Sequence, residues 1–377
     1  MQMARATFEG VRNLRPDERP FVLTRAGYAG VQRFSSVWTG DNVATWEHLQ
    51  LSVPMLTNLG VSGVPFVGAD VGGFSGDATP ELFARWMQVA AVTPFFRSHV
   101  EKGRQDREPW AFGPEVERIS RAAIELRYRL LPYLYTLFRE HEETGAPVMR
   151  PLWFEYPHDF ATYTMPTHLD EFLVGRDLLV APVMTAGDVR RMVYFPRGDA
   201  WVDWWTGRRY EGGAWAAVEA PLERLPLFLR AGAVVPVQPV VQHTGETARA
   251  PLSLVVAANV GADANAGTTP APATQTLWAG ASDSRVYEDA GEGYEPLRGA
   301  FRTLSVTSEG NTLRLKRAGA YNASRPLASV ELVGLAAQPR EVRADGRPVS
   351  GVTYDERTRR LSVPLPAGGV GEITVVP

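Results

Sequence analysis

Short apolar runs that end in a polar residue recur through the first third of the chain. Arg25 ends the run PFVLTR, Asp70 ends GVPFVGAD, and His99 ends PFFRSH. Continuous apolar runs of this length are typical of strands that are buried on both faces, as in a parallel sheet. Because active-site residues of a β/α barrel lie at the carboxyl ends of its strands, the pattern predicts that these polar side chains gather at one site.

Helical patterns alternate with these runs. We predict one helix from about Thr45 to Leu59, closed by Gly60, and another that begins at Thr79-Pro80-Glu81, where a hydroxyl, a proline and an acid follow one another. A third helix is predicted over Pro114 to Glu143. Strands that alternate with helices indicate a parallel sheet covered by helices.

The pattern changes at Gly145. Short β-type runs, split by Gly, Pro and Asp, follow in two sets: PVMRPLWF, DLLVAPVM, RMVYFP, WVDWW and AVVPV, then LSLVVAA, SRVYED, LRLKRA, SVELVG and EITVVP. Such spacing favours β-sandwiches. The fold class is therefore α/β plus all-β, with boundaries at 1–144, 145–239 and 240–377. A segment rich in Ala, Gly, Thr and Pro, residues 259–276, is predicted to be a floppy insertion in a hairpin.

Composition excludes several functions. The formal net charge of −3 gives no electrostatic reason to expect nucleic acid or an anionic membrane as a partner. There is no cysteine, hence no disulfide or thiolate metal site. No stretch reaches eighteen apolar residues, so no membrane span is predicted. The first residues contain no apolar signal core, which favours a cytoplasmic location.

Sequence motifs for cofactors and metals are missing as well. Neither the phosphate-binding nor the dinucleotide-binding glycine motif occurs, nor the G-x-S-x-G elbow. The six histidines show no H-x-x-x-H spacing, so no zinc site is predicted. The acidic stretch YEDAGEGYE, residues 287–295, is predicted to be a solvated hairpin rather than a Ca²⁺ site.

The segment VWTGDN carries the strongest chemical signal. Asp41 follows a predicted strand over Ser35 to Trp38, where a barrel places its chemistry. An indole wall from Trp38 would desolvate the carboxyl and raise its pKa, as a general acid in glycosidic cleavage requires. The alternative is that Asp41 caps the helix that begins near Thr45.

Other candidates follow the neighbouring strands. Arg25 could anchor substrate hydroxyls or keep a carboxylate ionised, or form a structural ion pair. Asp70 could pair with Arg25 or Arg97, bind a sugar hydroxyl, or act as a second catalytic carboxylate. Phe74 could be a platform at the pocket rim or a packing residue. His99, preceded by Arg97, could donate to a sugar hydroxyl or be structural.

Seven blocks of the sequence occur in the order found in one known family. They are RPFVLTRAGYAG, VWTGDN, GVPFVGADVGGF, ELFARWMQ, PFFRSH, RYRLLPYLYTLF and LPLFLRAGAVVP. The chain thus resembles glycoside hydrolase family 31, the α-glucosidase and α-xylosidase group. The resemblance implies a (β/α)₈ barrel followed by two β-sandwiches. It also implies a retaining α-glycosidase that hydrolyses terminal α-linked sugars without a cofactor.

The resemblance implies a role for each candidate residue. The aspartate of W-x-G-D-N, here Asp41, is the general acid/base of the family. Residues that contact or line the innermost sugar subsite correspond here to Arg25, Trp38, Phe74 and His99. The position of Asp70 supports the pocket floor, and Arg97 is taken as a further substrate-binding residue.

One block of the family is missing from the printed sequence. Family members take their nucleophile from a W-x-D-M-N-E block on an earlier strand, and this chain has none. The first residues instead read as part of a helix, with Met3, Phe8 and Val11 on one face. We therefore expect a fragment that holds the second half of the barrel and is inactive alone. It could come from a truncated chain, a split gene or a misplaced start codon, and a separate N-terminal half-barrel polypeptide could complete it. The alternatives are a non-catalytic carbohydrate-binding or assembly subunit, and a catalytic pair formed by Asp41 and Asp70.

Overall fold

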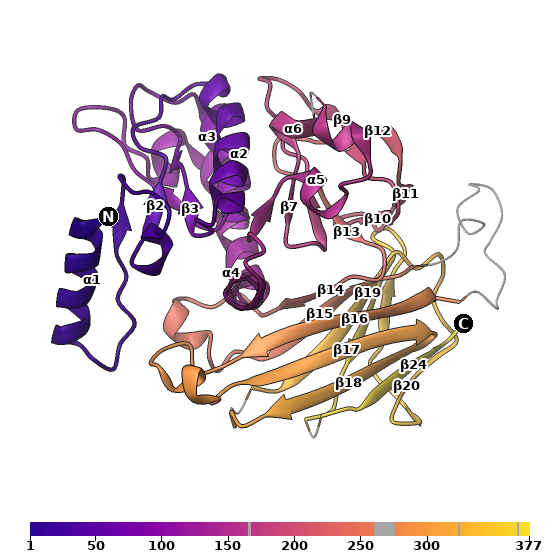
Figure 1. The fold of residues 1–377 in the computed structure, drawn as a ribbon. Helices are drawn as coiled ribbons and strands as arrows, with labels where there is room; N and C mark the ends of the chain where they lie inside the picture. Colours follow the sequence, from indigo (N-terminus) through magenta and orange to yellow (C-terminus); the bar gives the residue numbers. More distant parts are fainter. Residues whose placement is uncertain (165–166, 260–275, 323–324, 368) are drawn as a thin grey trace. The chain divides into compact units, whose positions relative to one another are not determined.

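The computed structural model describes residues 1–164, 167–259, 276–322, 325–367 and 369–377 (Figure 1). These residues form two compact units. The first comprises Met1–Arg127, Leu137–Pro196 and Gly213–Pro226, and the second comprises Tyr128–Thr136, Arg197–Gly212 and Leu227–Pro377. Most of the predicted insertion, residues 260–275, lies outside the described residues.

The first unit begins with alternating helices and short parallel strands. Its elements are α1 (Gln2–Leu14), β1 (Leu23–Thr24), β2 (Ser36–Trp38), α2 (Trp46–Val61), β3 (Val67–Gly68), β4 (Asp70–Val71), α3 (Pro80–Ala91), β5 (Arg97–Ser98) and α4 (Pro114–Thr144). Strands β1, β2 and β3 form one parallel sheet, and β4 pairs with β5 in parallel. The predicted alternation and the parallel pairing are both confirmed.

The helix starts follow the local sequence. The Thr45 hydroxyl accepts a hydrogen bond from His48 N (3.3 Å) at the start of α2, and the Thr79 hydroxyl accepts one from Leu82 N (3.3 Å) at the start of α3. Each bond satisfies one backbone donor that the first helical turn leaves free. The predicted end of α2 was wrong, because the helix continues through Gly60 to Val61.

The predicted strand GVPFVGAD is broken in the structure. Val67–Gly68 pairs with β2, whereas Asp70–Val71 pairs with β5. The run therefore changes its strand partner at Ala69. A Cβ on Gly68 would lie 2.1 Å from the carbonyl oxygen of Phe95, which shows how closely the two backbones approach there. The run FFRSH is also shorter than predicted, with only Arg97–Ser98 in a strand.

The rest of the first unit is mainly antiparallel. It contains β6 (Met149–Arg150), α5 (Leu152–Glu155), α6 (Thr167–Asp170), β7 (Phe172–Val174), β8 (Leu178–Val180), β9 (Arg190–Phe195) and β12 (Ala214–Glu219). The prediction of β structure for the run PVMRPLWF is wrong for the second half of the run, which lies in the helical turn α5. The buried Arg150 guanidinium bonds to Glu155 within that turn and to Glu140 on α4 (2.8 Å), which favours the turn over a strand.

Among its described residues, the second unit consists mainly of strands, together with its part of α4 and short 3₁₀ turns. Strand β10 (Ala200–Asp203) pairs with β11 (Arg209–Glu211) and β13 (Leu227–Arg230). One five-stranded sheet has the order β14-β15-β19-β23-β22, with bounds Val234–Val237, Leu252–Ala257, Leu327–Val333, Arg360–Pro364 and Thr353–Asp355. A six-stranded sheet has the order β16-β17-β18-β24-β20-β21, with bounds Trp278–Glu288, Arg302–Gly310, Thr312–Gly319, Glu372–Val376, Glu341–Ala344 and Arg347–Pro348.

These two sheets share one hydrophobic core. Side chains from both, including Leu254, Val330, Val306 and Ile373, belong to the same buried cluster. Alternating burial along β17 and β18 leaves one face of that sheet polar, as expected for a two-layered β fold.

The acidic stretch 287–295 joins β16 to β17 in an antiparallel hairpin, as predicted. Its first residues are not solvated, however. Glu288 is buried and pairs with Arg302 (2.9 Å), and Asp289 accepts hydrogen bonds from the hydroxyls of Tyr135 (2.7 Å) and Tyr287 (2.9 Å). The carboxylates at the start of this turn are therefore engaged in holding the hairpin.

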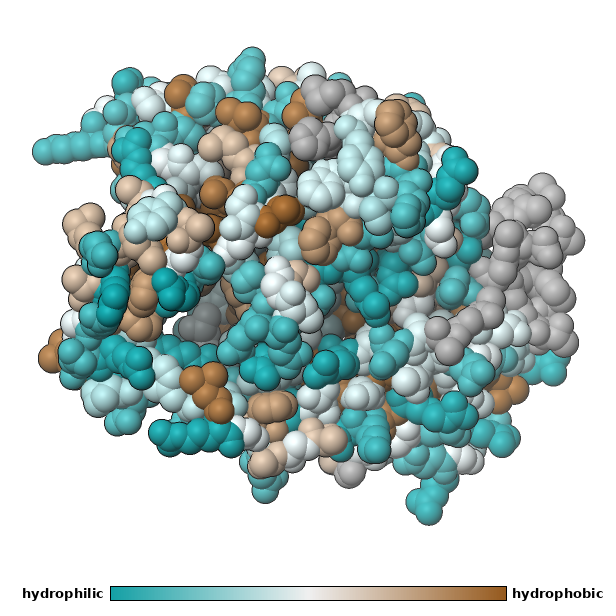
Figure 2. Space-filling view, in the orientation of Figure 1, coloured by the Kyte–Doolittle hydropathy of each residue, from teal (hydrophilic) through white to brown (hydrophobic). Residues whose placement is uncertain are grey.

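In the face shown in Figure 2, polar residues predominate, and hydrophobic residues occur singly or in small groups. Over the described part of the chain, no helix is both long enough and apolar enough to cross a membrane. Among the same residues, no group of three or more His, Asp or Glu side chains is placed to hold a metal ion.

Candidate functional site

Asp41 lies on a loop that follows β2. We call residues 39–45 the aspartate loop. The Asp41 carboxylate remains 43% exposed and accepts a hydrogen bond from Arg25 Nη1 at 3.0 Å, with the Arg25 side chain 59% exposed. Gly40 has φ +83°, and a Cβ there would lie 2.9 Å from Arg25 Nε. Glycine at this position therefore permits both the turn and the ion pair.

The structure excludes the capping role that the sequence left open for Asp41. Thr45 is the N-cap of α2, and its hydroxyl accepts the hydrogen bond from His48 N. Asp41 is thus free to face solvent and Arg25. The prediction that Trp38 buries this carboxylate is wrong, because the carboxylate is well exposed. The half-buried Trp38 ring instead faces the Arg97 guanidinium, which lies 5.1 Å from the ring centroid.

Asp70 and Arg97 form a buried ion pair between β4 and β5. Arg97 Nε donates to Asp70 Oδ1 at 3.1 Å, and Nη2 donates to the same oxygen. The Asp70 side chain is 1% exposed, and burial raises its pKa while Arg97 opposes the rise. Of the partners that the sequence allowed for Asp70, the structure selects Arg97, and Arg25 pairs with Asp41.

Phe74 and His99 bring two rings together. Their centroids are 5.3 Å apart with planes inclined by 31°; His99 is exposed and Phe74 is half-buried. Beyond burial and Arg97, the charge of Asp41 raises the pKa of Asp70 and that of His99 lowers it, so both groups act electrostatically on Asp70. The residues predicted from separate strand ends therefore form two ion pairs, a cation–ring contact and a ring pair, and both Asp41 and His99 act electrostatically on Asp70.

Sequence reasoning assigned no role to Asn42, the residue after Asp41. Asn42 is 8% exposed. Its Nδ2 donates to the carbonyl oxygen of Asp70 (2.9 Å), and its Oδ1 accepts from Phe74 N (2.9 Å). The motif W-x-G-D-N contains this residue, but nothing local distinguishes it from an ordinary turn asparagine.

Arg107 was also missed. Its buried guanidinium donates to the carbonyl oxygens of Gly73 (3.3 Å), Gly76 (2.6 Å) and Gln105 (2.9 Å). Burial lowers the pKa of Arg107. The side chain supports residues 72–77, which we call the glycine loop, from the side of the loop that follows β5.

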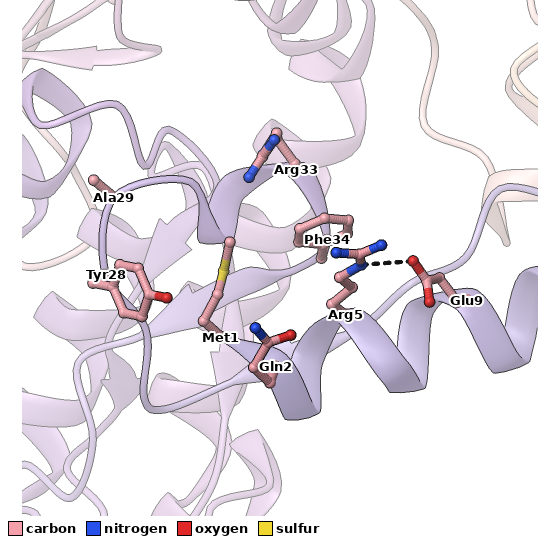
Figure 3. A pocket seen from close by; sticks show the side chains of 8 residues that line it. All are labelled: Met1, Gln2, Arg5, Glu9, Tyr28, Ala29, Arg33 and Phe34. Atoms are coloured by element: carbon pink, nitrogen blue, oxygen red, sulfur yellow. Dashed lines mark hydrogen bonds and ion pairs between the residues drawn. The ribbon is translucent and has the colours of Figure 1, made fainter.

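A separate pocket of about 480 Å³ lies between α1 and the segment after β1 (Figure 3). The Met1 side chain points toward Arg33 and Phe34, and Arg5 is bonded to Glu9 at 2.7 Å (Figure 3). The lining residues are Met1, Gln2, Arg5, Glu9, Tyr28, Ala29, Arg33 and Phe34. None of the predicted site residues is among them, so this pocket is distinct from the Asp41 site.

An exposed carboxylate on a loop that follows a parallel strand lies where β/α barrel enzymes place their catalytic groups. Comparison with known families agrees. The glycosyl hydrolases family 31 TIM-barrel domain matches residues 1–137, and the glycosyl hydrolase family 31 C-terminal domain matches residues 145–235. The chain belongs to glycosyl hydrolase family 31.

Known relatives support this membership. Alpha-glucosidase 2 of Bacillus thermoamyloliquefaciens is 54% identical over 242 residues, which are 64% of this chain and 30% of that protein. A probable glucan 1,3-alpha-glucosidase of Arabidopsis thaliana is 42% identical over 285 residues, 75% of this chain and 29% of that protein. The chain therefore spans about 30% of the length of these relatives.

Solved structures show the same fold. The GH31 dextranase of Flavobacterium johnsoniae, in complex with glucose, has a TM-score of 0.85 and 31% identity. The match covers 100% of this chain and 48% of the dextranase. The α-xylosidase of Xanthomonas citri has a TM-score of 0.75 and 30% identity, with 92% of this chain and 38% of that chain covered.

Proposed function

We propose that this chain contributes the acid/base half of a retaining α-glycosidase site, with Asp41 as the acid/base. The observation that carries the proposal is the Asp41 carboxylate itself. It is exposed, it is not a helix cap, and Arg25 holds it at 3.0 Å on the loop that follows a parallel strand. Family membership and the α-glucosidases among the relatives support an α-linked glucoside or oligosaccharide as the substrate.

In the proposed reaction, protonated Asp41 donates its proton to the glycosidic oxygen as the bond from that oxygen to the anomeric carbon breaks. A carboxylate nucleophile forms an ester with the anomeric carbon. The Asp41 carboxylate then accepts a proton from water, and the hydroxyl displaces the ester with net retention of configuration. Arg25 and His99 would donate hydrogen bonds to sugar hydroxyls, and Trp38 and Phe74 would offer apolar faces to the ring.

The nucleophile is proposed to come from outside these 377 residues, because the printed sequence has no W-x-D-M-N-E block. Asp70 is poorly suited to that role. Its side chain is 1% exposed, and one of its oxygens already accepts two hydrogen bonds from Arg97. The other oxygen, Oδ2, is also buried and has no contact with solvent, so a substrate carbon cannot reach it in this fold, which argues against a catalytic pair of Asp41 and Asp70.

The finer domain description is also a proposal. Residues 1–144 would be the second half of a (β/α)₈ barrel, followed by β-sandwiches at 145–239 and 240–377. The parallel pairing of β1, β2 and β3 and the shared core of the two later sheets support this description. The partner is proposed to be a half-barrel that carries the nucleophile.

The experiment compares the purified chain alone with the chain mixed with the upstream barrel half of the Bacillus relative. Turnover of 4-nitrophenyl α-glucoside is expected only in the mixture, and Asp41→Asn is expected to lower it at least about 100-fold. Turnover by the chain alone, lost with Asp41→Asn, would overturn the external nucleophile. Turnover that survives Asp41→Asn would overturn the role of Asp41.

The second candidate is a non-catalytic carbohydrate-binding or assembly subunit. The missing nucleophile block is the observation that favours it. Calorimetric titration with isomaltotriose separates the two candidates. Binding of this sugar by the chain, with no hydrolysis by the mixture, would support the non-catalytic subunit.

A further inference from the structure

Two loops of the site are joined along their backbones. Ser75 N donates to the carbonyl oxygen of Asn42 (2.9 Å), and Ala44 N donates to the carbonyl oxygen of Ser75 (2.8 Å). Val43 and Ser75 form an isolated parallel bridge. The aspartate loop and the glycine loop therefore follow each other for several residues, although neither forms a regular strand there.

The Asn42 side chain locks this junction. Its amide nitrogen donates to the carbonyl oxygen of Asp70, and its amide oxygen accepts from Phe74 N, both at 2.9 Å. These partners lie at the two ends of the segment that leads from β4 into the glycine loop. One planar group thus joins the residue after the acid/base candidate to the strand that carries Asp70 and to the backbone of Phe74.

The glycine loop is itself fixed. Gly73 has φ +82°, and a Cβ there would lie 2.4 Å from Ala44 N, so the two loops are in direct backbone contact. On its other side, the buried Arg107 donates to the carbonyl oxygens of Gly73 and Gly76. Asn42 therefore ties the aspartate loop to a support that cannot easily shift.

We infer that Asn42 is a positioning residue for Asp41. By fixing the aspartate loop on the glycine loop, it holds the Asp41 carboxyl at a set place relative to Asp70 and the Phe74–His99 rings. This inference rests on the proposed function for the role of Asp41. A misplaced general acid loses much of its effect even when the fold is intact, because proton transfer requires hydrogen-bond reach.

The chemistry of the position explains why an amide is needed. The site requires one donor and one acceptor in the same short, planar group. Aspartate would keep the acceptor for Phe74 N but would set a carboxylate against the carbonyl oxygen of Asp70. Alanine would leave both buried partners without a hydrogen bond.

The first test measures amide hydrogen exchange in the chain itself, with no need for activity. Asn42→Ala is expected to speed exchange in the aspartate loop and at Phe74 on the order of 10-fold. Asn42→Asp is expected to protect Phe74 more than alanine does. The matched control is Asn58→Ala, at an exposed asparagine on α2, which should leave both loops unchanged. Unchanged exchange in Asn42→Ala would overturn the inference.

The second test separates positioning from general destabilisation through the leaving group. It uses kcat/KM, in the mixture described above, for 4-methoxyphenyl α-glucoside and for α-glucosyl fluoride. Departure of fluoride needs little help from a general acid. Asn42→Ala is expected to lower kcat/KM on the order of 100-fold for the aryl glucoside and only a few-fold for the fluoride.

Equal losses on the two substrates would overturn the positioning role, since a merely unstable protein loses both activities together. Failure of the wild-type mixture on both substrates would overturn the proposed function instead. In that case the exchange experiment still decides whether Asn42 holds the aspartate loop, so the two failures are distinguishable.

Discussion

Replacing Arg97 with methionine should destabilise the protein in a way that depends on pH. The Asp70 side chain is 1% exposed and the Arg97 side chain is 26% exposed, so the pair is mostly buried. Breaking a buried ion pair costs about 3–5 kcal/mol, because the remaining charge has no partner. Since Arg97 keeps some contact with solvent, we expect Arg97→Met to cost about 2–3 kcal/mol at neutral pH.

The sign of the pH dependence follows from the pKa of Asp70. Burial raises it above the ordinary value of 3.8, and Arg97 opposes the rise. A carboxyl with a raised folded-state pKa binds its proton more tightly in the native protein. The native state therefore loses stability as the pH rises from the unfolded value through the folded one. Without Arg97 that loss extends to higher pH.

The assay is urea unfolding at pH 4.5 and pH 7.5, followed by tryptophan fluorescence. The difference between wild type and Arg97→Met should be small at the lower pH and largest at the higher. The matched control is the double variant Asp70→Asn/Arg97→Met, in which the charge is absent and the penalty should no longer grow with pH. A penalty for Arg97→Met that is the same at both values would refute the reasoning.

Two further predictions concern other parts of the first unit. Gly73→Ala should lower the free energy of unfolding in urea by about 3 kcal/mol, because the residue has a positive φ and its Cβ would meet Ala44. Gly103→Ala, also at a positive φ but with open space around it, should lower it by about 1 kcal/mol. Equal costs would contradict the close approach of the two loops. Glu171, a buried residue directly before β7, accepts hydrogen bonds from Arg191 Nη2 and Tyr194 N, both at 3.0 Å. Burial raises the pKa of Glu171 to about 8, although Arg191 opposes the rise, so thermal stability should fall as the pH rises from 5 to 9. Glu171→Gln should flatten that fall, and an unchanged slope in the variant would contradict the prediction.

The features that the sequence predicted well are local ones. The starts of α2 and α3 depend on hydroxyls of Thr45 and Thr79 that bond to residues three positions later. The alternation of helices with apolar runs also depends on short-range periodicity. Such signals survive in a single sequence because both partners lie within one turn.

Features that depend on distant partners were not predicted. The break in GVPFVGAD comes from a change of strand partner at Ala69 and from the close approach of Gly68 to Phe95. The sequence predicted a strand where the turn α5 forms. The turn is held by Arg150, which bonds to Glu155 and to Glu140, and Glu140 lies on another element, α4. Neither arrangement leaves a periodic signal in its own segment.

The candidate site divides in the same way. Residue type and position after apolar runs made Asp41, Asp70 and His99 candidates for the site. They did not identify Asn42, whose side-chain partners lie 28 and 32 positions away in the sequence. The pairing choices were also open, because Arg25 and Arg97 were equally plausible partners for a carboxylate until the structure placed each of them.

The central claim is that Asp41 is the acid/base of a retaining site, and azide rescue tests it most directly. In the mixture with the upstream barrel half, Asp41→Ala with α-glucosyl fluoride should still form the glycosyl ester, because fluoride leaves without an acid. Azide should then attack that ester without base assistance. We predict an α-configured glucosyl azide, identified by NMR. No azide product, or one with the β configuration, would contradict the assignment of Asp41.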